Sequence, residues 1–455
     1  MAFTTLNVFY GTIVHSISID QLEIASNSLL VVDNDKGVIV SFEREVNDVE
    51  KFLEKLDRSY KLFRLTPEQF LFPGLVDTHA HAPQYLFAGS GMDLQLLDWL
   101  NTYVFRAESS FKSSQVAKDA YTKVVSRFLR NGTTTCSWFA TIHLEACKIL
   151  VDTIQQLGQR AYVGKVNMDQ NSPDFYIEAS AQASLDDTRA FIEYTLEKQD
   201  QQKLITPVVT PRFAITCSSE LMQGLGKLAQ EYKLPIQTHL CENQNEIEFT
   251  CSLFPKSKNY TSIYADHGLL GDKSYMAHCV YMTDEEIDML AEYNTGISHC
   301  ANSNFSLHSG VCDVRRFLNK GVKVGLGTDV AGGFAPSMLD AIRSSFFASK
   351  CTLMAHRDRK EKYEHLGTSE LVYLATLGGA RVLGLQETIG NFAVGKAFDA
   401  LVVDLNSENG SSVDLMGHET PLQKVEKFLF NGNDQSLAHV FVQGRRVAGS
   451  ASSLE

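Results

Sequence analysis

Apolar and polar residues alternate along the middle of the chain in a pattern that predicts repeated strand and helix units. Short apolar runs typical of buried strands are separated by amphipathic stretches of helical length. Because such alternation favours a parallel sheet covered by helices, we predict an α/β fold with eight strands, that is, a (β/α)8 barrel. The predicted strands are residues 74–78, 133–139, 161–167, 204–210, 235–240, 274–280, 295–299 and 322–327. The predicted helices include residues 115–130, 144–157, 185–197, 220–232, 284–293 and 313–319.

The two ends of the chain carry a different pattern. Near the start, residues 7–10 and 28–32 are short β-type runs, and a turn signal, Asp33-Asn-Asp-Lys-Gly37, follows the second. Similar runs at 399–404 and 439–447 lie near the other end. We therefore expect the two ends to pair into one small β-sandwich domain. The predicted division is 1–70 and 386–455, including a short tail, for this domain and 71–385 for the catalytic barrel.

Composition and charge narrow the class of protein. The chain has 455 residues, of which 44% are hydrophobic and 21% charged, as in a globular protein with a sizeable core. Its formal net charge of −13 disfavours nucleic acid and anionic membrane surfaces as partners. The sequence shows neither a signal-peptide pattern nor an apolar run of the roughly 18 residues needed to span a bilayer. The nine cysteines form no CxxC pair, so we expect reduced thiols and a cytoplasmic location.

Polar residues gather where the predicted strands end, which is where barrel enzymes carry their active sites. His79 and His81 are two residues apart at the end of the first strand, so both imidazoles can point to the same side. His239 ends the fifth strand and Asp329 follows the eighth. Imidazole and carboxylate ligands suit zinc or a similar divalent ion, and we predict that these four residues bind one. Taken alone, Asp329 would fit a turn or helix-capping aspartate slightly better, and its position beyond the eighth strand is what favours a ligand.

Two further residues are predicted to handle protons. Glu242 lies three residues beyond His239, near enough to exchange protons with an activated water without binding metal. An acid at this position also fits the start of a helix, where the helix dipole favours it. His278 lies near the end of the sixth strand and could orient the attacking water, or be a core histidine with satisfied nitrogens. The role of His299 stays open between support of the site and burial.

These residues together resemble the metal-dependent amidohydrolase superfamily, and their spacing covers nearly the whole chain. The motifs that carry this resemblance are Phe72-Pro-Gly-Leu-Val-Asp-Thr-His-Ala-His81, His239-x-x-Glu242, Ala277-His278, Ser298-His-Cys and Gly327-Thr-Asp329. More narrowly, the chain is similar to the branch of that superfamily that deaminates guanine. The motifs that match this branch include His79-Ala-His-Ala-Pro-Gln84-Tyr, Asn131-Gly-Thr-Thr-Thr135, Val209-Thr-Pro-Arg-Phe213 and Gly325-Leu-Gly-Thr-Asp-Val-Ala-Gly-Gly333.

The narrower resemblance implies a function and a set of roles. The implied reaction is hydrolytic deamination of guanine to xanthine and ammonia by a cytoplasmic homodimer with one zinc ion per chain. Gln84, Arg212, Phe213 and His239 would contact the purine base. Glu242, His278 and Asp329 would be catalytic.

Two alternatives remain at this stage. Another deaminase or chlorohydrolase of the same superfamily, acting on a different aminated heterocycle, would use the same metal chemistry. A catalytically silent scaffold or cytoskeletal-binding relative would not need these residues. Because the chain retains all four predicted metal ligands together with Glu242 and His278, we favour an enzyme.

Overall fold

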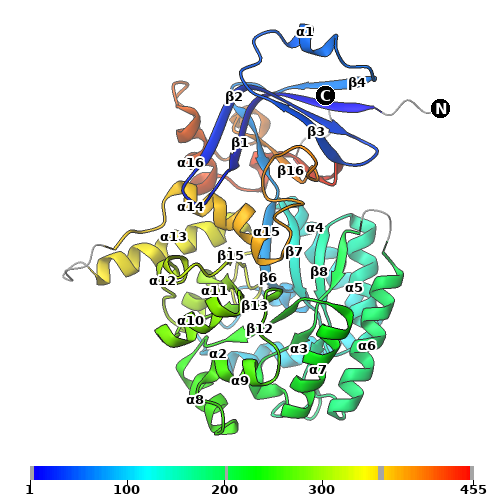
Figure 1. Ribbon diagram of the computed structural model, residues 1–455, viewed down its shortest axis with the longest axis vertical. Helices are drawn as coiled ribbons and strands as arrows, with labels where there is room; N and C mark the ends of the chain where they lie inside the picture. Colours follow the sequence, from blue (N-terminus) through cyan, green and yellow to red (C-terminus); the bar gives the residue numbers. More distant parts are fainter. Residues whose placement is uncertain (1–4, 200–202, 357–362, 451–455) are drawn as a thin grey trace.

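The protein has a mixed α/β fold in which parallel sheets with surrounding helices lie beside one separate sheet. The computed structural model describes residues 5–199, 203–356 and 363–450. Figure 1 shows the separate sheet at the top and the parallel strands below it, with α5 and α6 along one outer side and α10, α12 and α13 toward the other. Among the described residues, no helix is both long and apolar enough to cross a membrane.

The separate sheet, called here the terminal sheet, contains strands from both ends of the chain. Its order is β18-β17-β16-β5-β1-β2-β3, and β4 pairs with β1. The two ends meet where β16 runs antiparallel to β5, with Ala400 opposite Pro73. The predicted pairing of the two ends is therefore confirmed, but within one sheet, and the predicted sandwich of two sheets is not confirmed. The strands are β1 (Leu6–Ser16), β2 (Leu22–Asp33), β3 (Val38–Glu43), β4 (Tyr60–Arg64), β5 (Gln69–Pro73), β16 (Ala400–Asp404), β17 (Leu437–Val442) and β18 (Arg445–Ala448).

The strands of the central region are parallel, as the sequence predicts. They form two four-stranded sheets, β10-β8-β7-β6 and β12-β13-β14-β15, and a two-stranded sheet, β11-β9. Two predicted strands are each interrupted; β10 ends at Pro207, which has no N–H to donate to a neighbouring strand. The strands are β6 (Leu75–His81), β7 (Thr133–Phe139), β8 (Arg160–Gly164), β9 (Val166–Asn167), β10 (Ile205–Pro207), β11 (Thr210–Pro211), β12 (Ile236–Leu240), β13 (Ser274–His278), β14 (Gly296–His299) and β15 (Val324–Leu326).

Several helices begin at recognisable capping residues. Helix α8 begins after Asn243, whose side chain accepts from the backbone while Glu246 reaches back to the backbone at the cap, and Thr283 and Glu286 do the same for α10. The longer helices are α4 (Ser114–Arg130), α5 (Leu144–Leu157), α6 (Ala181–Glu197), α7 (Ser219–Tyr232), α8 (Gln244–Leu253), α10 (Asp284–Glu292), α13 (Met338–Ala355) and α16 (Pro421–Asn431). The shorter ones are α1 (Val49–Leu53), α2 (Leu96–Trp99), α3 (Phe105–Ser109), α9 (Tyr260–Asp266), α11 (Ala301–Ser306), α12 (Val314–Asn319), α14 (Thr368–Tyr373) and α15 (Gly379–Val382).

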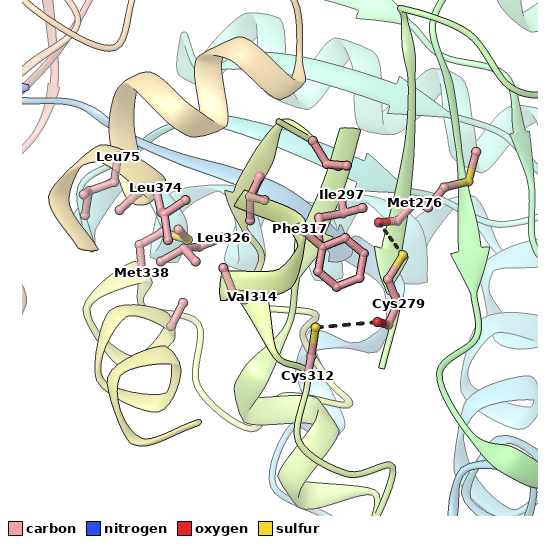
Figure 2. Close-up of a cluster of buried hydrophobic side chains, with 14 of the residues drawn as sticks. Leu75, Met276, Cys279, Ile297, Cys312, Val314, Phe317, Leu326, Met338 and Leu374 are labelled. Carbon is pink, nitrogen blue, oxygen red and sulfur yellow. Dashed lines mark hydrogen bonds between the residues drawn. The ribbon is translucent and has the colours of Figure 1, made fainter. Parts of the chain in front are cut away.

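The largest buried cluster lies between the parallel strands and the helices that cover them, and it extends to the terminal sheet. Figure 2 shows part of it, where Ile297 of β14 lies near Phe317 of α12 and Leu326 of β15 lies near Leu374. Two of its cysteines are labelled there: Cys312 Sγ donates to the carbonyl oxygen of Cys279 over 3.6 Å, and Cys279 Sγ donates to that of Met276 over 3.8 Å. The nine cysteines are all free, as the sequence predicts.

A buried ion pair joins the terminal sheet to the parallel strands. Arg160 at the start of β8 donates from Nε and Nη2 to the two carboxylate oxygens of Asp399, over 2.8 and 3.2 Å. Asp399 immediately precedes β16, and its backbone oxygen accepts from Gly74 at the entrance to β6. This bidentate pair therefore fixes the terminal sheet to the strands that carry the polar residues described next.

Candidate active site

The predicted polar residues lie together at the carboxyl ends of the parallel strands. His79 and His81 belong to β6, His239 to β12 and His278 to β13, whereas Asp329 lies beyond β15. Backbone hydrogen bonds join the first and last of these segments: Asp329 N donates to His79 O over 2.8 Å, and His81 N to Val330 O over 2.9 Å. Strand pairing thus brings residues that are up to 250 positions apart (79 to 329) into one buried cluster.

The cluster has the spacing of a metal site. One ligand atom from each of His79, His239, His278 and Asp329 lies within 4.8 Å of the others. His81 belongs to the same cluster, since its Nε2 lies 3.2 Å from His239 Nε2 and 3.4 Å from Asp329 Oδ1. The structure therefore brings all four predicted ligands together. It also places a ring nitrogen of His278 at a similar distance from them.

The chemistry of these groups fits a divalent cation. His239 Nδ1 lies 2.6 Å from the carbonyl oxygen of Arg212, so the proton is on Nδ1 and Nε2 presents a lone pair to the cluster. Burial lowers the pKa of His81 to about 4 and that of His239 well below its ordinary value, so both rings are neutral. His79 Nε2 is buried and faces Asp329 Oδ1 at 3.1 Å without making a hydrogen bond. Neutral imidazoles beside a carboxylate are a typical zinc ligand set.

Asp329 completes this set as an anion. Burial alone would raise the pKa of its carboxyl group, but the neighbouring imidazoles of His79, His81 and His278 outweigh that effect and hold the pKa well below its ordinary value. Asp329 and His278 both have a positive φ, 47° and 71°, which is uncommon outside glycine. Such backbone conformations persist where surrounding structure enforces them, often at functional sites.

Glu242 lies beside His278 of the cluster in an arrangement suited to proton transfer. His278 Nε2 lies 3.4 Å from Glu242 Oε2 and 3.7 Å from Asp329 Oδ2. Burial, followed by the nearby charge of Asp329, raises the pKa of Glu242 to about 8. A carboxyl group with this pKa can both accept and release a proton near neutral pH.

A cleft opens beside the cluster, with about 400 Å³ of empty volume including its mouth. Every residue predicted to contact a substrate lines it. The lining residues are His81, Gln84, Leu96, Trp99, Leu100, Arg212, Phe213, His239, Glu242, His278, Leu307 and Asp329.

Comparison with known proteins agrees with this geometry. Residues 70–447 match the model of the amidohydrolase family. The chain belongs to the amidohydrolase family. It is 43% identical over 450 residues to a probable guanine deaminase of Schizosaccharomyces pombe, covering 98% of this chain and 84% of that protein. It is 41% identical over 452 residues to human guanine deaminase, covering 98% of each.

A solved amidohydrolase structure is similar throughout. A guanine deaminase from C. acetobutylicum, crystallised with guanine bound in its active site, superposes with a TM-score of 0.88 at 36% identity. The superposition covers 97% of this chain and 99% of that one. The sequence-based assignment to the amidohydrolase superfamily is therefore confirmed.

Some residues of this amidohydrolase site are absent from the sequence-based prediction. Asn304 Oδ1 lies 2.9 Å from His278 Nδ1, and Ser309 Oγ donates to Glu242 Oε1 over 3.0 Å. Glu108 contacts both Gln84 and Arg212. Asn304 lies in a stretch, Ser-His-Cys-Ala-Asn-Ser-Asn304, that the sequence singles out for its histidine, whereas Ser309 and Glu108 have no local motif.

His299 lies outside the metal cluster of this family member. Its two ring nitrogens are buried without a hydrogen-bond partner among the described residues. Burial lowers the pKa of His299 to about 3, so the ring is neutral. Its side chain is fully buried, which fits the structural role left open by the sequence.

Proposed function

We propose that this protein is a guanine deaminase, which hydrolyses guanine to xanthine and ammonia. One observation carries the proposal: a single buried cleft combines a His–Asp cluster of metal-site spacing with Glu242, and with an Arg–Gln pair suited to a purine base. The similarity to guanine deaminases along nearly the whole chain supports the same substrate.

The proposed cofactor is one zinc ion per chain, held by His79, His81, His239 and Asp329. The neutral rings of His81 and His239 and the anionic Asp329 support this set, and His278 is left free for catalysis. When bound, zinc would supply a Lewis acid that lowers the pKa of water.

In the proposed reaction, a water molecule attacks C2 of guanine and Glu242 moves the protons. Glu242 Oε2 takes a proton from the attacking water and delivers it to the adjacent ring nitrogen. His278, whose Nδ1 is held by Asn304 at 2.9 Å, directs Nε2 toward Glu242 and Asp329 and orients the water. When the tetrahedral carbon collapses, the proton of its new hydroxyl group passes to the amino group, the C–N bond breaks and ammonia leaves, and C2 keeps the oxygen as the oxo group of xanthine.

Other side chains that line the same cleft recognise the base. The planar guanidinium group of Arg212 offers N–H donors suited to the lactam oxygen of guanine, and Gln84 adds a side-chain amide. Phe213, whose ring centroid is 6.3 Å from that of His239, gives an apolar face for the purine ring.

The test is an ammonia-release assay with guanine, adenine, cytosine and aminated triazines, combined with elemental analysis of the same sample. We expect turnover of guanine, xanthine as the product, and about one zinc per chain. Release of ammonia from a triazine or from adenine, with guanine untouched, would replace this proposal with another deaminase of the family. No release from any of them would favour a non-catalytic role.

We further propose that the parallel strands close into a (β/α)8 barrel spanning residues 71–385. Two features support closure: the hydrogen bonds between the end of β6 and the segment after β15, and a parallel bridge between Val209 and Ile236. The remaining residues, 1–70 and 386–455, would form the second domain. Limited proteolysis that releases residues 71–385 as one resistant fragment would support this division.

We also propose that the protein is a cytoplasmic homodimer. Free thiols at all nine cysteines suit a reducing compartment. Helix α13 exposes Phe347 and Met354, at 61% and 64% of their surface, and a second copy of the chain could cover them. Light scattering should give twice the chain mass, and Phe347→Asp should shift the population to monomer.

A further inference from the structure

Glu108 on α3 contacts both residues proposed to recognise the base. It is fully buried, and its two carboxylate oxygens have different partners. Oε2 accepts a hydrogen bond of 2.7 Å from Arg212 Nη1, and Oε1 accepts one of 2.8 Å from Gln84 Nε2. One carboxylate therefore bridges two residues that are 128 positions apart (84 to 212) and lie side by side in the cleft.

The bridge fixes which way the Gln84 amide points. Its nitrogen donates to Glu108, and its oxygen accepts from the backbone N–H of Ala331 over 3.2 Å. A flipped amide would place its NH2 group against the N–H of Ala331 and its oxygen against the carboxylate, so both contacts would become repulsive. Gln84 therefore has its oxygen engaged and one N–H still available.

The same helix fixes Arg212. The ring centroid of Phe105, one turn before Glu108 on α3, lies 5.3 Å from Arg212 Cζ, so α3 supplies both a charge partner and a stacking face. Burial alone would raise the pKa of Glu108, but Arg212 outweighs it and lowers the pKa below its ordinary value. Glu108 is therefore a carboxylate, which only accepts hydrogen bonds.

We propose that Glu108 is a positioning residue that sets the hydrogen-bond polarity of the base pocket. The Arg212 guanidinium only donates hydrogen bonds, and Glu108, by accepting from Gln84 Nε2, orients the amide so that its remaining N–H adds to a wall of N–H donors. The pocket then favours a purine with an oxo group at the recognised position over one with an amino group there. The inference rests on the proposed deamination and deepens it by naming what enforces the choice of substrate.

The wild-type protein gives a first test with two purines. Guanine and 2,6-diaminopurine both carry the 2-amino group that is lost as ammonia, but the second has an amino group in place of the oxo group. Because a donor wall repels an amino group, kcat/KM for guanine should exceed that for 2,6-diaminopurine by at least about 100-fold, with products identified by chromatography. Comparable values of kcat/KM would overturn the proposal.

Glu108→Gln gives the second test. The introduced amide cannot accept from both partners, so one of them must turn. We expect the ratio of the two kcat/KM values to fall at least about 10-fold while zinc content stays at the wild-type level. A loss of activity on both purines at an unchanged ratio would show a merely structural role and contradict the proposal.

Two further variants separate polarity from packing. Glu108→Asp keeps an acceptor-only carboxylate but shortens it, so kcat/KM for guanine should fall while the ratio stays high. Glu286→Gln makes the same chemical change in a buried glutamate at the start of α10, which contacts Thr283 and Thr261. It should leave the ratio unchanged. If Glu108→Gln does not fold, the wild-type ratio and Glu108→Asp still decide.

These outcomes are distinct from failure of the proposed function. If the zinc-loaded wild-type protein released no ammonia from guanine, the function itself would be wrong. If it turned over guanine but accepted 2,6-diaminopurine equally well, only the role of Glu108 would be wrong.

Discussion

His239 Nδ1 lies 2.6 Å from the backbone oxygen of Arg212, which connects a proposed metal ligand to a proposed base-binding residue. This hydrogen bond fixes the tautomer of His239, and its acceptor is the backbone of the residue whose side chain meets the base. The metal site and the base pocket therefore share one rigid element, so a change at either one should displace the other.

Replacement of Glu242 by Gln should remove proton transfer but leave the metal site intact. Turnover of guanine should fall by about 10² to 10⁴-fold, the scale of a lost general acid–base, while zinc remains bound. Steady-state kinetics and elemental analysis of the same preparation would measure both. Glu248→Gln, at an exposed position on helix α8, which begins just after Glu242, is the matched control and should behave as wild type. Near-normal turnover by Glu242→Gln would remove this residue from the mechanism.

Replacement of Asp329 by Ala should instead reduce metal content. The variant loses the anionic ligand of the cluster, and its remaining imidazoles hold a divalent ion less tightly. Zinc per chain after dialysis should be well below that of the wild-type protein, and activity should fall with it. Full zinc occupancy in the variant would count against a ligand role for Asp329.

The buried pair of Arg160 and Asp399 should contribute strongly to stability. Asp399→Asn leaves the Arg160 guanidinium buried without its anionic partner, so the free energy of unfolding should fall by about 3–5 kcal/mol. Denaturant unfolding followed by circular dichroism would measure the change. The double variant Arg160→Met with Asp399→Leu, which removes both charges, should recover much of the loss. A single variant as stable as wild type would show that the pair is not needed.

His439 on β17 predicts how stability depends on pH. Burial, followed by the charge of Arg446, lowers its pKa to about 4, below the value of about 6.5 expected in an unfolded chain. Between these values the unfolded state binds more protons, so stability should fall as the pH is lowered from about 6.5 toward 4. His439→Gln should make the dependence of the unfolding midpoint on pH shallower in this window. An unchanged dependence would show that His439 does not contribute.

The sequence predicts much of the parallel region because its signals are local. The predicted strand at 133–139 coincides with β7, and the helices predicted at 144–157 and 115–130 match α5 and, within one residue, α4. The predicted metal ligands lie together for the same reason, since each one ends or follows a parallel strand and those ends share one side of the sheets.

Other features depend on contacts that local patterns do not encode. Glu108 lies in the long connection after β6, which folds into short helical segments rather than one periodic helix. Its partner Arg212 is 104 residues away, so neither neighbourhood predicts the other. The terminal sheet raises the same difficulty, because strand patterns predict that its strands exist but not whether they form one layer or two.

The pairing of β5 with β16 also determines when the protein can complete its fold. The chain leaves the terminal sheet at Pro73, the end of β5, and returns to it at Ala400, the start of the neighbouring strand β16. During synthesis, one edge of β5 therefore stays unpaired until the whole catalytic segment and then β16 to β18 have been made. The last strands to emerge close the sheet that the first strands begin.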